Sequence, residues 1–434
     1  MADSELAFEL AWLVGIADAP AERATFASLA ITVGQIPITE VDDRIAQTVR
    51  RDIRVPTLPL AKWLIVNWWR LRWEPRPEAI TSPWLRAHCM AAVSTDVPWP
   101  AFNITSDGEF VSLEARAERI HDVSAVRYLR DVDVTIPAHQ FESAVDGFLA
   151  QLDARIASCV PDDDDFKLLI AELRDERSNP KLARICRLQA IAGFDPGTAP
   201  SEWTRAAEQL AGEAGKATGD EIIAAVPLLR DGVDGARAAL EAMKRSRVEI
   251  RIPNGIDAGH KATAELPWQH GRRMANAFRT AHQIGDGPLP TSALEQLLET
   301  RLPLPVSPTI AGRRLSGGYR DSYPRARTRI VVTTDRPDNQ RFYLGRLIAA
   351  SLLAPATDNF LPITNAATAF QKFERSFAQE LLCPWQALDD FTNDSGLDDD
   401  GISSAAEHFI VSEHLILSTL VNNGKLSRDR LPYT

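Results

Sequence analysis

The chain has 434 residues, of which 45% are hydrophobic and 25% are charged, a balance typical of globular proteins. This length is too great for one hydrophobic core and predicts two or three domains. The net charge of −11 argues against a protein that coats nucleic acid, and the lack of an apolar run of about 20 residues argues against a membrane span.

Residues 1–136 alternate strand-like runs with turn signals. The segment 26–41 has two runs of period-2 alternation on either side of Gly34, and residues 106–108 (Ser-Asp-Gly) predict the turn of a hairpin. Segment 60–71 has apolar residues on most sides of a helix, which predicts burial. We therefore expect an N-terminal α+β domain with considerable sheet.

Tryptophan is concentrated in this first region, since six of the ten tryptophans lie between residues 63 and 99. Aromatic side chains bury large areas, so a role in the core explains the cluster. A second interpretation is an aromatic recognition surface for a partner, which would include Trp68, Trp69 and Trp73.

Residues 137–265 are predicted to be mostly helical. Segment 139–159 places apolar residues at helical spacing, and segment 201–229 predicts two further short helices. Segment 248–265 has the composition of a linker or of a strand and loop. We expect a helical middle region that ends in this linker.

Arginine is concentrated between residues 313 and 346, where nine arginines face three aspartates. Arg325, Arg327 and Arg329 alternate, so they would share one face of a strand and could bind phosphate or carboxylate groups. The alternative is a solvated strand face that pairs with the protein's own acids. Residues 316–318 (Ser-Gly-Gly) predict a mobile loop within this stretch.

Residues 266–434 contain three predicted helices, at about 341–353, 366–382 and 402–422. The first reads RFYLGRLIAASLL, and the second contains FAQELLCP, from Phe377 to Pro384. With the segments 267–284 and 406–426, these blocks resemble the ImmA/IrrE family of zinc peptidases. The resemblance implies a C-terminal zincin-like domain, and therefore a multidomain α+β protein.

The same resemblance implies that the zinc site is lost. In the family, two histidines at i and i+4 bind zinc, and a glutamate beside the first histidine is the general base. Aligned here, Arg346 and Ala350 replace the histidines, Leu347 replaces the glutamate, and Gln371 replaces a carboxylate ligand. Glu374 lies three residues further on, on roughly the same helix face but about 4.5 Å along the axis. No metal, no cofactor and no catalysis of the family type are expected.

The leading functional prediction is a pseudopeptidase that acts as a regulatory or interaction protein. The family resemblance suggests a protein partner, such as a helix-turn-helix regulator or a subunit of a bacterial phage-defence or mobile-element complex. One alternative is a nucleic-acid-binding component of such a complex, and another is a metallopeptidase with a non-standard metal site. The candidate residues for binding a partner or an anion are Arg325, Arg327, Arg329, Arg341, Arg346, Trp68, Trp69 and Trp73.

The cysteines and the first residues bear on location. The four cysteines have no paired spacing, which fits reduced thiols better than disulfides or a metal cluster. The segment MADSELAFEL lacks a basic leader followed by an apolar core, so no signal peptide is expected. Both observations predict a cytoplasmic protein.

Overall fold

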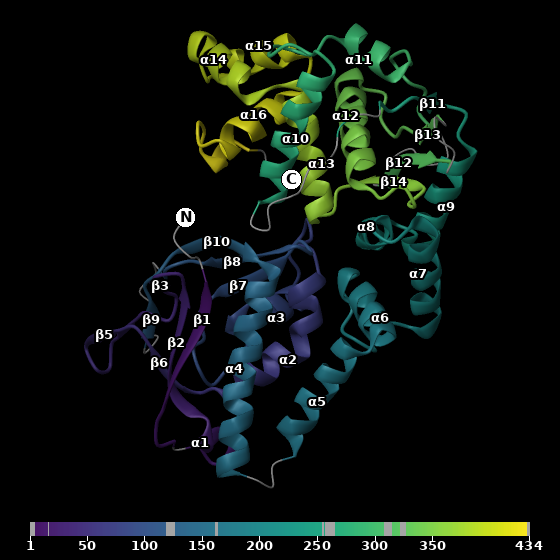
Figure 1. Ribbon diagram of the computed structural model, residues 1–434. Helices are drawn as coiled ribbons and strands as arrows, with labels where there is room; N and C mark the ends of the chain where they lie inside the picture. Colours follow the sequence, from purple (N-terminus) through teal and green to yellow (C-terminus); the bar gives the residue numbers. More distant parts are fainter. Residues whose placement is uncertain are drawn as a thin grey trace. The chain divides into compact units, whose positions relative to one another are not determined.

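The computed structural model describes residues 5–15, 17–118, 126–160, 164–253, 256, 265–307, 315–321 and 327–431. The chain divides into two compact units, Met1–Thr204 (unit 1) and Arg205–Thr434 (unit 2), whose elements are labelled in Figure 1. Each unit has its own core of buried apolar side chains. Helices combined with small antiparallel sheets confirm the predicted α+β class.

The described residues of unit 1 form three antiparallel sheets. In the first, β2 (Phe26–Val33) pairs with β1 (Leu6–Trp12), β3 (Ile36–Pro37) and β6 (Ile53–Pro56). The second has the order β5 (Thr48–Arg50), β4 (Val41–Asp43), β9 (Val126–Tyr128), and the third has the order β10 (Val132–Pro137), β8 (Phe110–Ala115), β7 (Phe102–Ser106). The predicted hairpin is confirmed, because β7 and β8 pair across a turn in which Gly108 has a φ of 96°.

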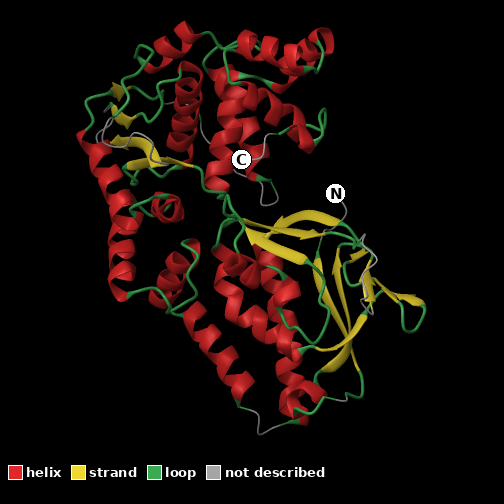
Figure 2. Cartoon of the chain, turned by 180° about the vertical axis from the view of Figure 1, so that it is seen from behind, coloured by secondary structure: helices red, strands yellow, loops and turns green. Residues whose placement is uncertain are grey.

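Helices of unit 1 pack against the first and third of these sheets (Figure 2). Unit 1 contains α1 (Pro20–Ala24), α2 (Leu58–Trp73), α3 (Ser82–His88), α4 (Ala138–Cys159), α5 (Asp165–Ser178) and α6 (Pro180–Ile191), with a short 3-10 helix at Met90–Ala92. Helix α2 is buried on most sides, as its sequence predicted, because α3, α4, α5 and α6 all pack around it. Helix α4 has the predicted apolar face, which contacts β1, β8 and β10.

Unit 2 contains a four-stranded antiparallel sheet with the order β11 (Glu249–Ile250), β13 (Thr328–Val331), β12 (Leu315–Arg320), β14 (Phe360–Thr364). The predicted mobile loop at 316–318 is wrong, since these residues lie in β12, an interior strand of the sheet. Glycine is needed there because a Cβ atom on Gly317, whose φ is 150°, would lie 2.2 Å from the carbonyl oxygen of Leu361 on β14. The two glycines therefore permit close strand approach and do not mark a turn.

The helices of unit 2 are α8 (Thr218–Ala225), α9 (Gly232–Arg245), α10 (Pro267–Ala281), α11 (Thr291–Leu298), α12 (Pro337–Leu353), α13 (Ala369–Leu382), α14 (Trp385–Ser395), α15 (Asp399–Phe409) and α16 (Glu413–Asn422), with 3-10 turns at Val226–Leu228 and Arg428–Arg430. Helices α12 and α13 confirm the helices that were predicted at about 341–353 and 366–382. The single helix predicted over 402–422 is wrong, because Ile410 adopts a left-handed φ of 55° and Ser412 caps a new helix.

The division between units differs from the three predicted segments 1–136, 137–265 and 266–434. Helices α4, α5 and α6 contribute to the core of unit 1, and α8 and α9 belong to unit 2. The division itself falls within α7 (Ser201–Ala214). The three predicted segments stay a prediction about which parts fold on their own.

None of the helices in the described ranges combines the length and the apolar character that a membrane crossing requires.

Candidate functional site

The three expected positions of the zinc-binding motif lie on α12, in the interior of unit 2. Helix α12 packs against α13 and β14, and a Cβ atom on Gly345 would lie 2.9 Å from that of Ala378 on α13, so the two helices are in close contact. Leu347 and Ala350 are fully buried and belong to the apolar core. Arg346 is also buried, and its charge therefore needs partners inside the protein.

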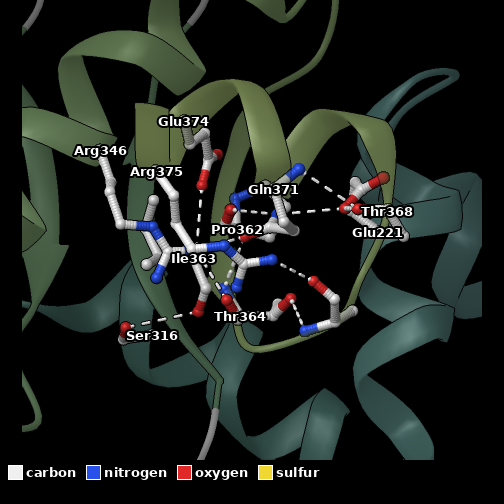
Figure 3. Close-up of polar contacts among 11 residues, drawn as sticks. Glu221, Ser316, Arg346, Pro362, Ile363, Thr364, Thr368, Gln371, Glu374 and Arg375 are labelled. Carbon is white, nitrogen blue, oxygen red and sulfur yellow. Dashed lines mark hydrogen bonds and ion pairs between the residues drawn. The ribbon is translucent and has the colours of Figure 1, made fainter. Parts of the chain in front are cut away.

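Those partners come from β14 and α13 (Figure 3). The Nη2 atom of Arg346 donates to the carbonyl oxygen of Thr364 at 2.6 Å and to the side-chain oxygen of Gln371, and it lies 3.2 Å from a carboxylate oxygen of Glu374. Gln371 and Glu374 thus reach the same guanidinium group, as expected for positions three residues apart on one helix face. Among the described residues, the Nε atom of Arg346 and the second oxygen of Glu374 have no hydrogen-bond partner.

Gln371 extends this network toward α8. Its side-chain oxygen also accepts from the backbone N–H of Thr364 at 3.0 Å, and its side-chain nitrogen donates to Glu221 at 3.0 Å. Thr368 caps α13 by accepting from the backbone N–H of Gln371, and its hydroxyl donates to Glu221 at 2.6 Å. We call Glu221, Arg346, Thr364, Thr368, Gln371 and Glu374 the buried network.

Helix α8, which carries Glu221, is fixed at its N-terminus by a second carboxylate. Asp358 accepts hydrogen bonds from the backbone N–H groups of Lys216, Ala217 and Thr218 at 2.8–3.1 Å. A negative charge at this position is favoured by the helix dipole. Burial raises the pKa of Asp358, but the three N–H groups outweigh this effect and hold the pKa below its ordinary value. Asp358 therefore holds α8 beside β14, and this contact places Glu221 in the buried network.

Burial shifts the pKa of each ionisable group in and beside the network toward the neutral form. It raises the pKa of Glu221 to about 7, although the Thr368 and Gln371 donors oppose the shift. Burial also raises the pKa of Glu374 well above its ordinary value, and Arg346 opposes this. It lowers the pKa of Arg346, which Glu374 counteracts, and it lowers the pKa of Arg375 to about 10, with a further contribution from the charge on Arg346.

The residues at the expected ligand positions do not fit a zinc ion. Zinc is bound by neutral imidazole, thiolate or carboxylate groups in tetrahedral geometry. Here Arg346 is a cation, Leu347 and Ala350 offer no donor atom, and the side-chain oxygen of Gln371 already accepts two hydrogen bonds. Within the described ranges, no group of three or more His, Cys, Asp or Glu side chains could hold a metal ion.

The predicted arginine stripe contacts acids of the protein itself. Arg327 donates to Glu299 at 3.0 Å, and Arg329 donates to Asp321 at 2.6 Å. Arg325 lies outside the described residues. For the two described arginines, the geometry agrees with the alternative of a strand face that pairs with its own acids. The role of the stripe in binding a partner stays a prediction.

Arg341 has a structural environment that its sequence position did not reveal. Its side chain is 1% exposed and donates to the backbone oxygens of Leu289 and Ile410 and to the hydroxyl of Thr291. It therefore joins α12 to the segment before α11 and to the residue that ends α15. This burial argues against the predicted role of Arg341 in binding a partner, as the burial of Arg346 does for that residue.

The predicted tryptophan surface is buried in unit 1. Trp68 and Trp69 are each 4% exposed, and the Nε1 atom of Trp69 donates to Glu176 at 2.7 Å. Trp73 is half-buried, with the guanidinium groups of Arg72 and Arg187 each 3.8 Å from its ring centroid. The geometry therefore favours the core interpretation, which explained the cluster by the area that its rings bury.

The sequence analysis missed Glu221, Thr368 and Asp358. A threonine three residues before Gln371 is a signal for a helix cap. Glu221 stands directly before the apolar run 222–226, which indicates a buried acid, although the run does not identify its partner. Asp358 carried no local signal, because its donors lie more than 100 residues away in the chain.

A comparison with known proteins finds no matching family model, no matching curated protein and no matching solved structure. The resemblance to the ImmA/IrrE family therefore depends on the residues quoted above.

Proposed function

We propose that this chain is a non-catalytic regulatory or interaction protein built on an inactive ImmA/IrrE-like peptidase fold. The observation that carries the proposal is the environment of Arg346. A permanent cation stands where the first zinc-binding histidine is expected, and the amide at the expected carboxylate position accepts its hydrogen bond.

The guanidinium group supplies the kind of cross-link that a metal ion supplies in an active enzyme. Arg346 on α12 contacts Thr364 on β14 and both Gln371 and Glu374 on α13. These contacts connect the same helices that a zinc ion would connect in the family, without a metal. A zinc ion placed among them would meet the positive charge of Arg346, and it would gain few ligands in return.

The position of α8 also supports a non-catalytic role. Glu221 accepts hydrogen bonds from the hydroxyl of Thr368 and the side-chain nitrogen of Gln371. These two donors are therefore not free to contact a substrate or a metal-bound water. Gln371 thereby has all of its polar atoms engaged within the protein. Such a site favours stability over turnover.

A protein partner follows from the family resemblance, which points to a helix-turn-helix regulator or a subunit of a phage-defence or mobile-element complex. A cytoplasmic location remains part of the proposal. It is supported by the four cysteines, which are all free.

Two alternatives have less support. Nucleic-acid binding would need the arginine stripe and exposed tryptophans, but Arg327 and Arg329 pair with acids, and Trp68 and Trp69 are buried. A relocated metal site would need a cluster of ligands, and the described part of the chain contains no suitable group.

Zinc content tests the proposal directly. The purified full-length chain, dialysed without a chelator, is expected to contain well below one zinc per molecule by elemental analysis. Its thermal unfolding temperature should be the same with and without EDTA, because no structural metal is lost. One tightly held equivalent of zinc, with a lower unfolding temperature in EDTA, would overturn the non-catalytic interpretation.

The interaction part of the proposal is tested by affinity capture from the native host, followed by reconstitution with each purified candidate partner. A stoichiometric complex with a regulator or a complex subunit is the expected result. Reproducible cleavage of such a protein by the purified chain would instead identify an active peptidase.

A further inference from the structure

Unit 2 contains a cavity of about 770 Å³ that no part of the proposed function uses. It is lined by one face each of α10, α13 and α16, together with the first turn of α12. Its volume lies within the range of sites that bind small organic molecules, roughly 300–1,000 Å³. The cavity therefore has the size of a ligand site.

The charge of the cavity wall is strongly positive for a chain that is acidic overall. Among its described lining residues, four are cations and one is an acid. The cations are Arg272 on α10, Lys372 and Arg375 on α13, and Arg428 after α16. The acid, Asp338, already forms an ion pair with Arg336 at 2.8 Å. The charges of Arg375 and Arg428 select for an anionic ligand.

Two neighbouring acids do not remove this excess. Glu380 lies 3.6 Å from Arg272, but burial raises the pKa of its carboxyl group, which weakens its negative charge. Asp429, beside Arg428, accepts a hydrogen bond from Ser427. In the described part of the chain, neither Arg375 nor Arg428 forms an ion pair.

Arg375 is a cation of the cavity wall that a bound anion would stabilise. It donates to the carbonyl oxygen of Ala366 at 2.7 Å. Its pKa is lowered to about 10 by burial and by the nearby charge of Arg346. A bound anion would offset both effects, since it adds an opposite charge where the positive charge is least favourable.

An aromatic side chain stands beside the cations. Trp268, one helical turn before Arg272 on α10, is 39% exposed, and the ammonium group of Lys372 lies 5.9 Å from its ring centroid. The half-buried ring of Phe342 also lines the cavity. An exposed indole ring beside cations suits a ligand that has both a flat ring and negative groups, because the ring can stack while the charges pair.

We propose that this cavity binds a nucleoside phosphate, with the phosphate toward Arg375 and Arg428 and the base against Trp268. The volume suits one nucleotide and not a nucleic-acid chain. This ligand site goes beyond the proposed function and does not depend on it, because none of the evidence for it involves zinc or the partner protein.

Isothermal titration calorimetry of the full-length chain at physiological salt tests the proposal with AMP, ATP and GTP. At least one nucleotide is expected to bind with a Kd in the micromolar range. Adenosine, which lacks the phosphate, and pyrophosphate, which lacks the ring, should each bind at least about tenfold more weakly. No binding of any nucleotide at millimolar concentration would overturn the proposal, as would equal affinity for pyrophosphate.

Three substitutions locate the site. Trp268→Ala should weaken nucleotide binding about tenfold and leave pyrophosphate binding unchanged, because only base stacking is lost. Arg428→Ser should weaken both. Arg430→Ser is the matched control, since Arg430 lies on the same 3-10 helix but pairs with Asp399 at 2.8 Å and does not line the cavity. Nucleotide binding that survives the first two substitutions, or that is lost equally in the control, would contradict this location.

Discussion

Each unit buries an arginine beside a glutamate, but the two pairs have different surroundings. In unit 1, Glu74 accepts from Arg70 at 2.6 Å and contacts the Nε2 atom of His88 at 2.8 Å. The Nδ1 atom of His88 faces the carbonyl oxygen of Ile104 at 2.8 Å, so both ring nitrogens meet oxygen acceptors. In unit 2, Glu374 contacts Arg346, and its other carboxylate oxygen has no hydrogen-bond partner among the described residues.

The difference shows that the balance between burial and the donors around a buried carboxylate decides the direction of its pKa shift. Burial raises the pKa of Glu74, but His88 and Arg70 outweigh it, so the pKa falls below its ordinary value. In unit 2, burial of Glu374 and Glu221 outweighs their donors, and both pKa values rise. The pair in unit 1 has the properties of a structural ion pair, whereas the acids of the buried network have pKa values shifted toward the neutral form.

The largest effect is expected from removing the guanidinium group of the buried network. Arg346→Met should lower the free energy of unfolding of unit 2 by about 4 kcal/mol at pH 8, because the buried Glu374 then loses the cation that it pairs with. The loss should be smaller at lower pH, because the raised pKa values of Glu374 and Glu221 favour their neutral forms. Denaturant unfolding gives the free energy, and hydrogen exchange of peptides from each unit shows where stability is lost.

A double variant separates the charge from the packing. Arg346→Met with Glu374→Met replaces both partners by apolar groups and should recover most of the loss, since well-packed apolar residues often replace a buried ion pair without cost. If the double variant is as unstable as Arg346→Met alone, the ion pair does not explain the cost, and the role given to Arg346 would be withdrawn.

The next effect concerns unit 1. Glu74→Gln should lower its free energy of unfolding by about 3 kcal/mol at pH 7, because the buried Arg70 loses the carboxylate that it pairs with. The pKa of Glu74 is below its ordinary value of 4.5 when the protein is folded, so its contribution is present above about pH 4.5. It should disappear as the pH falls through the lowered value.

Asp195 provides the internal control for this pair. Its side chain is 49% exposed and lies 3.2 Å from Arg70, so Asp195→Asn should cost less than about 1 kcal/mol. Equal losses in Glu74→Gln and Asp195→Asn would show that burial does not distinguish the two carboxylates, and the comparison between the units would lose its basis.

The sequence predicted the local parts of this comparison better than the distant ones. Helices α2, α12 and α13 followed from their patterns, and the shared face of Gln371 and Glu374 followed from helix geometry. Glu221 contacts Gln371 although it lies 150 positions earlier in the chain, and no local sequence pattern predicts such a contact. The glycines of β12 were misread because a turn and a close strand approach use the same residue.

The buried arginines show a second limit. Arg341 and Arg346 stand in a stretch with a positive charge excess, which suggested a binding surface. Their donors instead contact backbone oxygens and side chains of unit 2. Composition reports how many charges a segment has, but only the packing decides which of them face solvent. The helix pattern of α12 could have indicated this, because apolar residues surround Arg346 on most sides.

The smallest effect is a pH dependence of opposite sign to that of Glu74. The pKa of Glu221 rises from its ordinary value of 4.5 to about 7 on folding, so the folded state holds a proton that the unfolded state has lost. The contribution of Glu221 to stability therefore falls as the pH rises from 4.5 to 7, by about 2 kcal/mol between pH 5 and pH 7. Unfolding in denaturant at pH 5, 6 and 7 should show a larger loss in the wild type than in Glu221→Gln, which keeps only the contribution of Glu374. Glu407→Gln, at an exposed position on α15, is the matched control and should follow the wild type. If Glu221→Gln also follows the wild type, then Glu221 is ionised in the folded state, and the opposite pH signs of the two units would not exist.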